Sequence, residues 1–449
     1  MQKAAIAAPS PKAVLAAGLV TTAAWVVAVL VLMAGTTYDI WAAPLIAPIL
    51  FAVTLPILIR EAKRTGDRKL LWILIGAVAI KLLGALVRFY GTFVIYDGGD
   101  AGTYHFEGIE VARALRAGYL DGGLESLTGT FFITYATGVL YALIGPTLLG
   151  GFLFFSWLSF WGFFFFYKAF ALAVPEGSKR MYAGLIFFLP SILYWPSSIG
   201  KEAWMTLALG VGSYGCAMVM KHRTLRGLLL VALGIWAAGV VRIPVAGMLG
   251  VALAGAYLLR KPRPELRQLA PIAKLISVAV LVAFAVFLIG KTEDFLQVDD
   301  IASEGLFSSS GIETALQNTA ARSDYGGSEF EPAIVTSPIK FPMAAVTVLF
   351  RPFPHEAGNI QAILTALEGT ALMLLTLIRW RWILAALKSV RRQPYVAFAV
   401  LFVVMFVVGF SSFPNFGLLV RQRVQVLPFL LVLLCIPPLR GRGERDDRA

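Results

Sequence analysis

The chain has 449 residues, of which 58% are hydrophobic and 14% charged, and its mean hydropathy is +0.78. Soluble domains carry roughly 25% charged residues, so this composition excludes an ordinary soluble globular protein. The formal net charge of +13 does not indicate a nucleic acid partner. The basic residues instead cluster in short junctions between apolar segments, as the positive-inside rule describes.

Many apolar segments reach the roughly 20 residues that a helix needs to cross the hydrocarbon of a bilayer. Because unpaired backbone groups are too costly in lipid, such segments must be helical. The sequence therefore predicts an all-α, polytopic transmembrane bundle that forms one integral membrane domain over residues 1–449. About twelve spans are expected, at 14–34, 41–59, 70–92, 148–172, 181–198, 202–220, 226–241, 243–260, 270–290, 359–379, 394–412 and 417–437.

Two further apolar stretches, 129–145 and 341–354, are short, and we expect neither to cross the membrane fully. Placing the basic junctions in the cytoplasm then predicts a multi-pass protein of the plasma (inner) membrane with both termini cytoplasmic. Two longer hydrophilic segments lie on the outer face in this topology. Segment 93–128 combines an acidic loop with an amphipathic juxtamembrane helix after the third span, and segment 291–340 is a soluble loop.

The acidic loop after the third span contains the first candidate site residues. Asp97 and Asp100 are separated by two glycines, which let the backbone bend tightly and expose both carboxylates. Tyr104 and His105 follow at the start of the expected helix. A solvated turn is the simpler interpretation of this loop, and the long amphipathic stretch behind it favours a site.

The predicted topology brings further ionisable residues to the same outer face. Charged groups near the hydrocarbon cost several kcal/mol each, so they tend to pair and to mark sites. Carboxylates beside fixed cations suit a lipid-linked phosphate or pyrophosphate, since the guanidinium fork matches phosphate oxygens and a carboxylate can act as general base. The expected substrate-binding residues are Tyr104, His105, Lys201, Glu202, Arg242, Arg351, His355, Glu356, Arg421 and Arg423.

Simpler interpretations compete with these assignments. Lys201 and Glu202 also fit a plain interfacial ion pair, and the outer arginines can extend to lipid headgroups. Arg88, near the outer end of the third span, is assigned to such a headgroup contact. Lys81 lies deep in the same span and is expected either to be functional or to pair with a buried acid such as Glu368. The histidines lack metal-ligand spacing, so no metal site is predicted, although a divalent cation stays open.

Three segments resemble the GT-C superfamily of polyprenyl-phosphate-dependent membrane glycosyltransferases. They are the GDAGTYHFEG stretch before the amphipathic helix, the later PSILYWPSSIGKEAW, and the closing NFGLLVRQRVQVLPFLL, which is also similar to a segment of polysaccharide polymerases. The resemblance implies an enzyme with a lipid-phosphate sugar donor and a loop acid as base. Carried over, Asp100 is the best match for that acid and Asp97 the second.

The first hypothesis is thus a glycosyltransferase that moves a sugar from a polyprenyl-linked donor to a glycan or lipid acceptor at the outer face of the bilayer. An O-antigen-type polymerase joining lipid-linked repeat units would use much the same charges. A transporter of lipid-linked sugars is a third hypothesis, but transporters usually place their polar groups near the midplane between repeated helices. An assembly scaffold is the fourth.

Overall fold

A computed structural model describes residues 11–96, 98–221, 224–259, 275, 278, 330–335 and 337–437. Within these ranges every regular element is a helix and no strand occurs. Six helices there are long and apolar enough to cross a membrane, and eight candidate spans result if each of two bent helix pairs counts as one. The prediction of a polytopic, all-helical membrane protein is therefore confirmed.

The first half of the chain forms one long helix after another, with short breaks. Its elements are α1 (Pro11–Gly35), α2 (Tyr38–Trp41), α3 (Ala43–Thr65), α4 (Arg68–Tyr90), the π-helix η1 (Gly91–Ile95), α5 (Gly99–Arg116), α6 (Gly129–Ile144), α7 (Leu148–Ala173), α8 (Lys179–Phe188), α9 (Pro190–Tyr194) and α10 (Lys201–Met220).

Shorter and more strongly bent helices make up the second half. They are α11 (Thr224–Val241), α12 (Ile243–Leu259), the 3-10 turn η3 (Pro338–Lys340), α16 (Phe341–Phe350), the 3-10 turn η4 (Pro354–Glu356), α17 (Ile360–Ile378), α18 (Trp380–Ser389), α19 (Pro394–Phe410), α20 (Phe416–Arg423) and α21 (Leu427–Leu434).

The expectation of about twelve spans is wrong for the described residues, which hold six to eight candidates. The hydropathy of a segment does not indicate where its helix breaks. The expected span 181–198 is divided between α8 and α9, because Pro190 has no amide hydrogen with which to continue α8. The expected span 417–437 bends by 60° between α20 and α21. The expected span 270–290 and most of the 291–340 loop lie outside the described residues.

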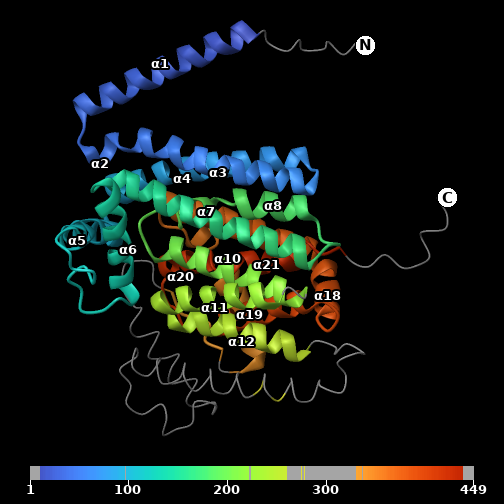
Figure 1. Ribbon diagram of the computed structural model, residues 1–449. Helices are drawn as coiled ribbons and strands as arrows, with labels where there is room; N and C mark the ends of the chain where they lie inside the picture. The colour runs from blue at the N-terminus through green and yellow to red at the C-terminus, as the bar shows by residue number, and fades with distance from the viewer. Residues whose placement is uncertain are drawn as a thin grey trace.

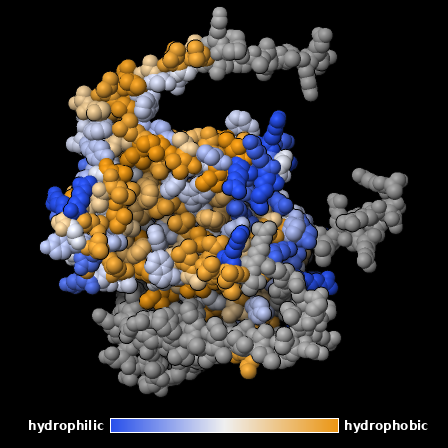
Figure 2. Space-filling view, viewed as in Figure 1, coloured by the Kyte–Doolittle hydropathy of each residue, from blue (hydrophilic) through white to orange (hydrophobic). Residues whose placement is uncertain are grey.

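The helices of the bundle run side by side between two ends (Figure 1). Helices α5 and α6 lie at one end, here called the α5 end, and α18 lies at the other, the α18 end. Orange, hydrophobic side chains cover the middle of the visible face and blue ones gather toward the two ends (Figure 2). This distribution suits an apolar belt within a bilayer, with polar groups at its two surfaces.

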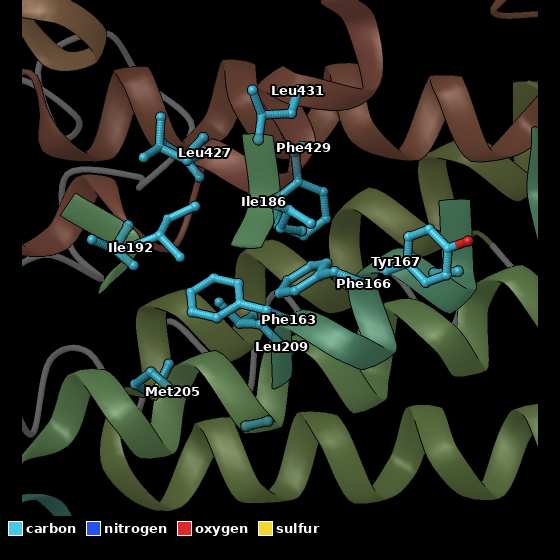
Figure 3. Close-up of a cluster of buried hydrophobic side chains, with 14 of the residues drawn as sticks. Phe163, Phe166, Tyr167, Ile186, Ile192, Met205, Leu209, Leu427, Phe429 and Leu431 are labelled. Carbon is cyan, nitrogen blue, oxygen red and sulfur yellow. The ribbon is translucent and has the colours of Figure 1, made fainter. Parts of the chain in front are cut away.

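Aromatic and aliphatic side chains from α7, α8, α10 and α21 fill the centre of the bundle (Figure 3). The rings of Phe166 and Phe429 pack edge to face with their centroids 5.3 Å apart. Helices α7 and α10 approach closely because glycines face each other across the contact. A Cβ atom built on Gly210 would lie 2.2 Å from the carbonyl oxygen of Gly162. Such small-residue contacts are a common way for membrane helices to associate.

We expect Gly210→Ala to destabilise the bundle by about 2 kcal/mol or more, because the added methyl group must push the α7 backbone away. The measurement is the thermal midpoint of the purified protein in detergent. Gly184→Ala is the matched control, since nothing lies within 4 Å of a Cβ atom at Gly184 in α8. Equal midpoints for the two variants would contradict the close α7–α10 contact.

Candidate functional site

A cavity of about 600 Å³ opens at the α5 end. Its wall is formed by the end of α4 with η1, the start of α5, the segment 195–200, the loop before α17 with its first turns, and α20. Aromatic rings of Tyr96, Trp195 and Phe416 share the wall with five ionisable side chains, which are Arg88, Asp100, Glu202, Glu356 and Arg421. Four of these five belong to the set predicted from the sequence.

Helix ends determine where the charges of this cavity lie. Asp100 is in the first turn of α5 and Glu202 in the first turn of α10, while Arg421 is in the last turn of α20. The helix dipole favours acids at amino ends and cations at carboxyl ends. The turn before α5 depends on Gly98, whose φ of 90° lies in the region that glycine adopts most readily.

Arg421 connects the two acids. Its Nη2 atom lies 3.0 Å from Oδ2 of Asp100 and 3.4 Å from Oε2 of Glu202. The Asp100 side chain is 62% exposed, whereas that of Glu202 is 4% exposed. Among the described residues, no donor contacts the second carboxylate oxygen of Asp100. One oxygen of Asp100 is thus held by Arg421 while the other is available to a bound molecule.

Glu202 also holds Arg242, which follows α11. Nη2 of Arg242 lies 3.0 Å from Oε1 of Glu202, and Nη1 donates a 2.6 Å hydrogen bond to Gln422. A buried carboxylate is costly unless it is paired and hydrogen-bonded. The two guanidinium groups compensate Glu202 in this way, and they join α10, the end of α11 and α20 at the rim of the cavity.

Two other arginines that were predicted to bind substrate instead bind groups of the protein itself. Arg351 is paired with Glu356, and its guanidinium carbon lies 4.8 Å from the ring centroid of Phe330. Burial alone would raise the pKa of Glu356, but hydrogen bonds from Arg351 and the Phe353 amide hold that pKa below its usual range. Arg423 is buried and donates to the backbone carbonyls of Val348 and Arg351. It therefore fastens α20 to α16.

Tyr104 and His105 face the protein interior instead of the cavity. His105 contacts Tyr141 Oη at 2.8 Å through Nδ1 and Asp39 Oδ1 at 3.6 Å through Nε2. Burial lowers the pKa of His105, and the Asp39 carboxylate opposes that effect. Burial, together with Asp100 and Glu202, raises the pKa of Tyr104 to about 12. His105 thus docks α5 onto α2 and α6.

The remaining predicted site residues, Lys201, His355 and Asp97, are not part of the described cavity wall. Lys201 opens α10 beside Glu202 but is not part of the cavity wall. His355 is exposed and its ring stacks on Phe353 with centroids 6.1 Å apart. Asp97 lies outside the described residues. The part of the chain that the structure describes contains no group of three or more His, Cys, Asp or Glu residues placed to hold a metal ion.

The short helix α9 sets the position of the cavity segment 195–200 that follows it. Lys81 of α4 donates a 2.6 Å hydrogen bond to the carbonyl oxygen of Ile192, and Glu368 of α17 accepts one of 2.6 Å from the amide of Ser191. Pairing with Glu368 is one of the two roles that the sequence predicts for Lys81. The two side chains instead bind neighbouring backbone groups of α9, which a break in the span leaves without helical partners.

Sequence reasoning missed the part that Arg88 plays in this wall. Its guanidinium carbon lies 4.6 Å from the ring centroid of Tyr194 and 4.8 Å from that of Trp195. Thr92 lies one turn further along the same span and also lines the cavity. The i,i+4 spacing of Arg88 and Thr92 was the available signal, because it puts both side chains on one face of a helix.

No known protein family, curated protein or solved structure matches the chain. The geometry of the cavity is therefore the basis for any functional argument.

Proposed function

We propose that the protein is a membrane glycosyltransferase that moves a sugar from a polyprenyl-phosphate-linked donor to a glycan or lipid acceptor. Asp100 acts as the general base, and the cavity at the α5 end is the reaction site. The α5 end faces the non-cytoplasmic side in this proposal, because the basic junction at 379–392, which contains α18, lies at the opposite end (Figure 1).

The single observation that supports this function best is the position of Asp100 at a cavity between candidate membrane helices. The cavity wall includes Arg88 and Thr365, which belong to the candidate spans Arg68–Ile95 and Ile360–Ile378. A lipid-linked substrate can therefore keep its chain in the bilayer while its polar head lies beside a carboxylate. A volume of about 600 Å³ is within the range of small-molecule sites.

The proposed reaction is a displacement at the anomeric carbon of the donor sugar. Asp100 takes the proton of an acceptor hydroxyl as that oxygen forms a bond to the anomeric carbon. The bond from the anomeric carbon to the phosphate oxygen breaks, and its electron pair leaves with the lipid phosphate. Positively charged groups in the cavity would stabilise the charge that develops on the departing phosphate.

The test is glycosyl transfer by the purified protein in lipid nanodiscs, supplied with polyprenyl-phosphate sugars labelled in the sugar. We expect release of polyprenyl phosphate together with a labelled acceptor product. A product larger by one sugar supports a single-sugar transferase. A ladder of products would indicate a polymerase instead. Movement of intact donor across the bilayer without any product would contradict an enzyme and indicate a transporter.

A further inference from the structure

We infer that Arg88 and Thr92 form the subsite that binds the phosphate of the lipid-linked substrate, a role that the sequence interpretation gave to other arginines. The inference rests on the proposed function in taking the cavity as the place where a lipid-linked phosphate binds. It assigns the phosphate to residues of α4 and η1, at the part of the cavity wall that belongs to a candidate membrane span.

The first argument is the balance of charge around the cavity. The ionisable side chains of the wall and their ion-pair partners comprise three carboxylates and four guanidinium groups, which are Asp100, Glu202, Glu356, Arg88, Arg242, Arg351 and Arg421. Arg242 and Arg421 are paired with Glu202, Arg421 also with Asp100, and Arg351 with Glu356. Among the described residues, Arg88 alone of these four has no carboxylate partner. Within this set of seven side chains, the positive charge that no carboxylate pairs with is therefore that of Arg88.

Unmet hydrogen-bonding capacity is the second argument. The Nε atom of Arg88 and the Oγ1 atom of Thr92 are both buried, and neither has a hydrogen-bond partner among the described residues. The Thr92 residue is only 6% exposed. A buried donor without a partner costs about 1–3 kcal/mol, and more if it is charged. Both residues line the same cavity, so a ligand there is placed to supply the missing acceptors.

The aromatic neighbours of Arg88 hold its guanidinium group in an orientation that can bind an anion. The rings of Tyr194 and Trp195 lie nearly perpendicular to each other, at 84°, and both are within 5 Å of the guanidinium carbon. Cation–π contacts hold the guanidinium plane in place without occupying its N–H donors. A planar fork fixed in this way can bind two phosphate oxygens, and the hydroxyl of Thr92 can donate to a phosphate oxygen as well.

The location also fits a lipid. Arg88 lies seven residues before the end of the candidate span Arg68–Ile95, so it is about 10 Å along the helix axis from the span's end. A headgroup phosphate bound at this depth leaves its prenyl chain beside the apolar belt, while the sugar attached to it can extend toward Asp100 at the start of α5. The phosphate subsite and the general base would then lie on two sides of the bond that breaks.

The test is a binding measurement in neutral detergent with three probes: geranylgeranyl phosphate, geranylgeraniol and dioleoyl phosphatidylglycerol. We expect geranylgeranyl phosphate to bind the wild type, and geranylgeraniol and the phospholipid to bind at least 10-fold more weakly. Arg88→Gln should weaken binding of geranylgeranyl phosphate by about 10-fold or more, because a charge-assisted hydrogen bond is lost. Thr92→Val should weaken binding of geranylgeranyl phosphate by a smaller factor. Arg88→Lys should also weaken it, because lysine keeps the positive charge but lacks the planar guanidinium fork.

Arg113→Gln is the matched control, because Arg113 is an exposed arginine of α5 paired with Glu110. Thermal midpoints measured without ligand show whether each variant is folded. If Arg88→Gln is not folded, Arg88→Lys still tests the subsite. Equal affinity of wild type and Arg88→Gln for geranylgeranyl phosphate would overturn the inference, as would equal binding of the phospholipid. The assay measures no transfer, so phosphate binding that depends on Arg88 supports the subsite even where the proposed reaction fails.

Discussion

An Asp100→Asn variant is expected to transfer sugar at least about 100-fold more slowly than the wild type, since a general base contributes about 10²–10⁴-fold to a rate. The asparagine has nearly the same shape but cannot accept the proton of the acceptor hydroxyl. The fold should persist, because the Asp100 side chain is 62% exposed and an exposed ion pair with Arg421 is worth only about 0–1 kcal/mol. The measurement is the initial rate of transfer, with the thermal midpoint recorded for the same preparation.

Asp121→Asn provides the control for Asp100→Asn. Asp121 lies in the exposed turn after α5, where its carboxylate accepts a 2.9 Å hydrogen bond from the amide of Gly123, and it is not part of the cavity wall. This variant should transfer sugar at the wild-type rate. Full activity in Asp100→Asn would show that another group takes the proton, and would remove Asp100 from the mechanism.

Glu202→Gln is expected to destabilise the protein by about 3 kcal/mol, because removing one member of a buried charge network leaves the others uncompensated. Glu202 is the buried acid that holds both Arg242 and Arg421, at 3.0 and 3.4 Å. The measurement is the thermal midpoint in detergent. Transfer should also fall in this variant, since Arg421 would lose one of the two carboxylates that position it beside Asp100.

A double variant separates charge compensation from loss of packing. If the cost of Glu202→Gln comes from uncompensated arginines, adding Arg242→Gln should recover part of the lost stability. Glu110→Gln is the control, because Glu110 is 69% exposed and paired only with its helix neighbour Arg113. Additive losses in the double variant would show that Glu202 and Arg242 do not depend on each other.

Composition was sufficient to predict the class of fold, because apolar segments of this length can only be helices in a bilayer. The number of spans was not predictable in the same way. Hydropathy treats 181–198 as one apolar run, yet Pro190 ends α8 and starts the separate helix α9. The geometry of α9 depends on Lys81 and Glu368, which lie far from it in the sequence and bind its backbone.

The site was predictable in part. The predicted topology assigns Asp100, Glu202 and Arg421 to the same face of the membrane. In the structure, Arg421 lies within ion-pair distance of both acids. Which cations are neutralised could not be read from the sequence, because it depends on distances of a few ångströms between separate helices. For this reason Arg423 was assigned to substrate although it binds backbone carbonyls, and Arg88 was assigned to a simple headgroup contact.

The most direct test of the central claim, that the cavity at the α5 end is the substrate site, is a cryo-EM structure of the Asp100→Asn protein in nanodiscs with a polyprenyl-phosphate sugar. We predict density for the phosphate beside Arg88 and Thr92, for the sugar near residue 100, and for the prenyl chain between α4 and α17. A donor bound at another surface of the protein, with the cavity occupied by phospholipid, would contradict the proposed function and the phosphate subsite together.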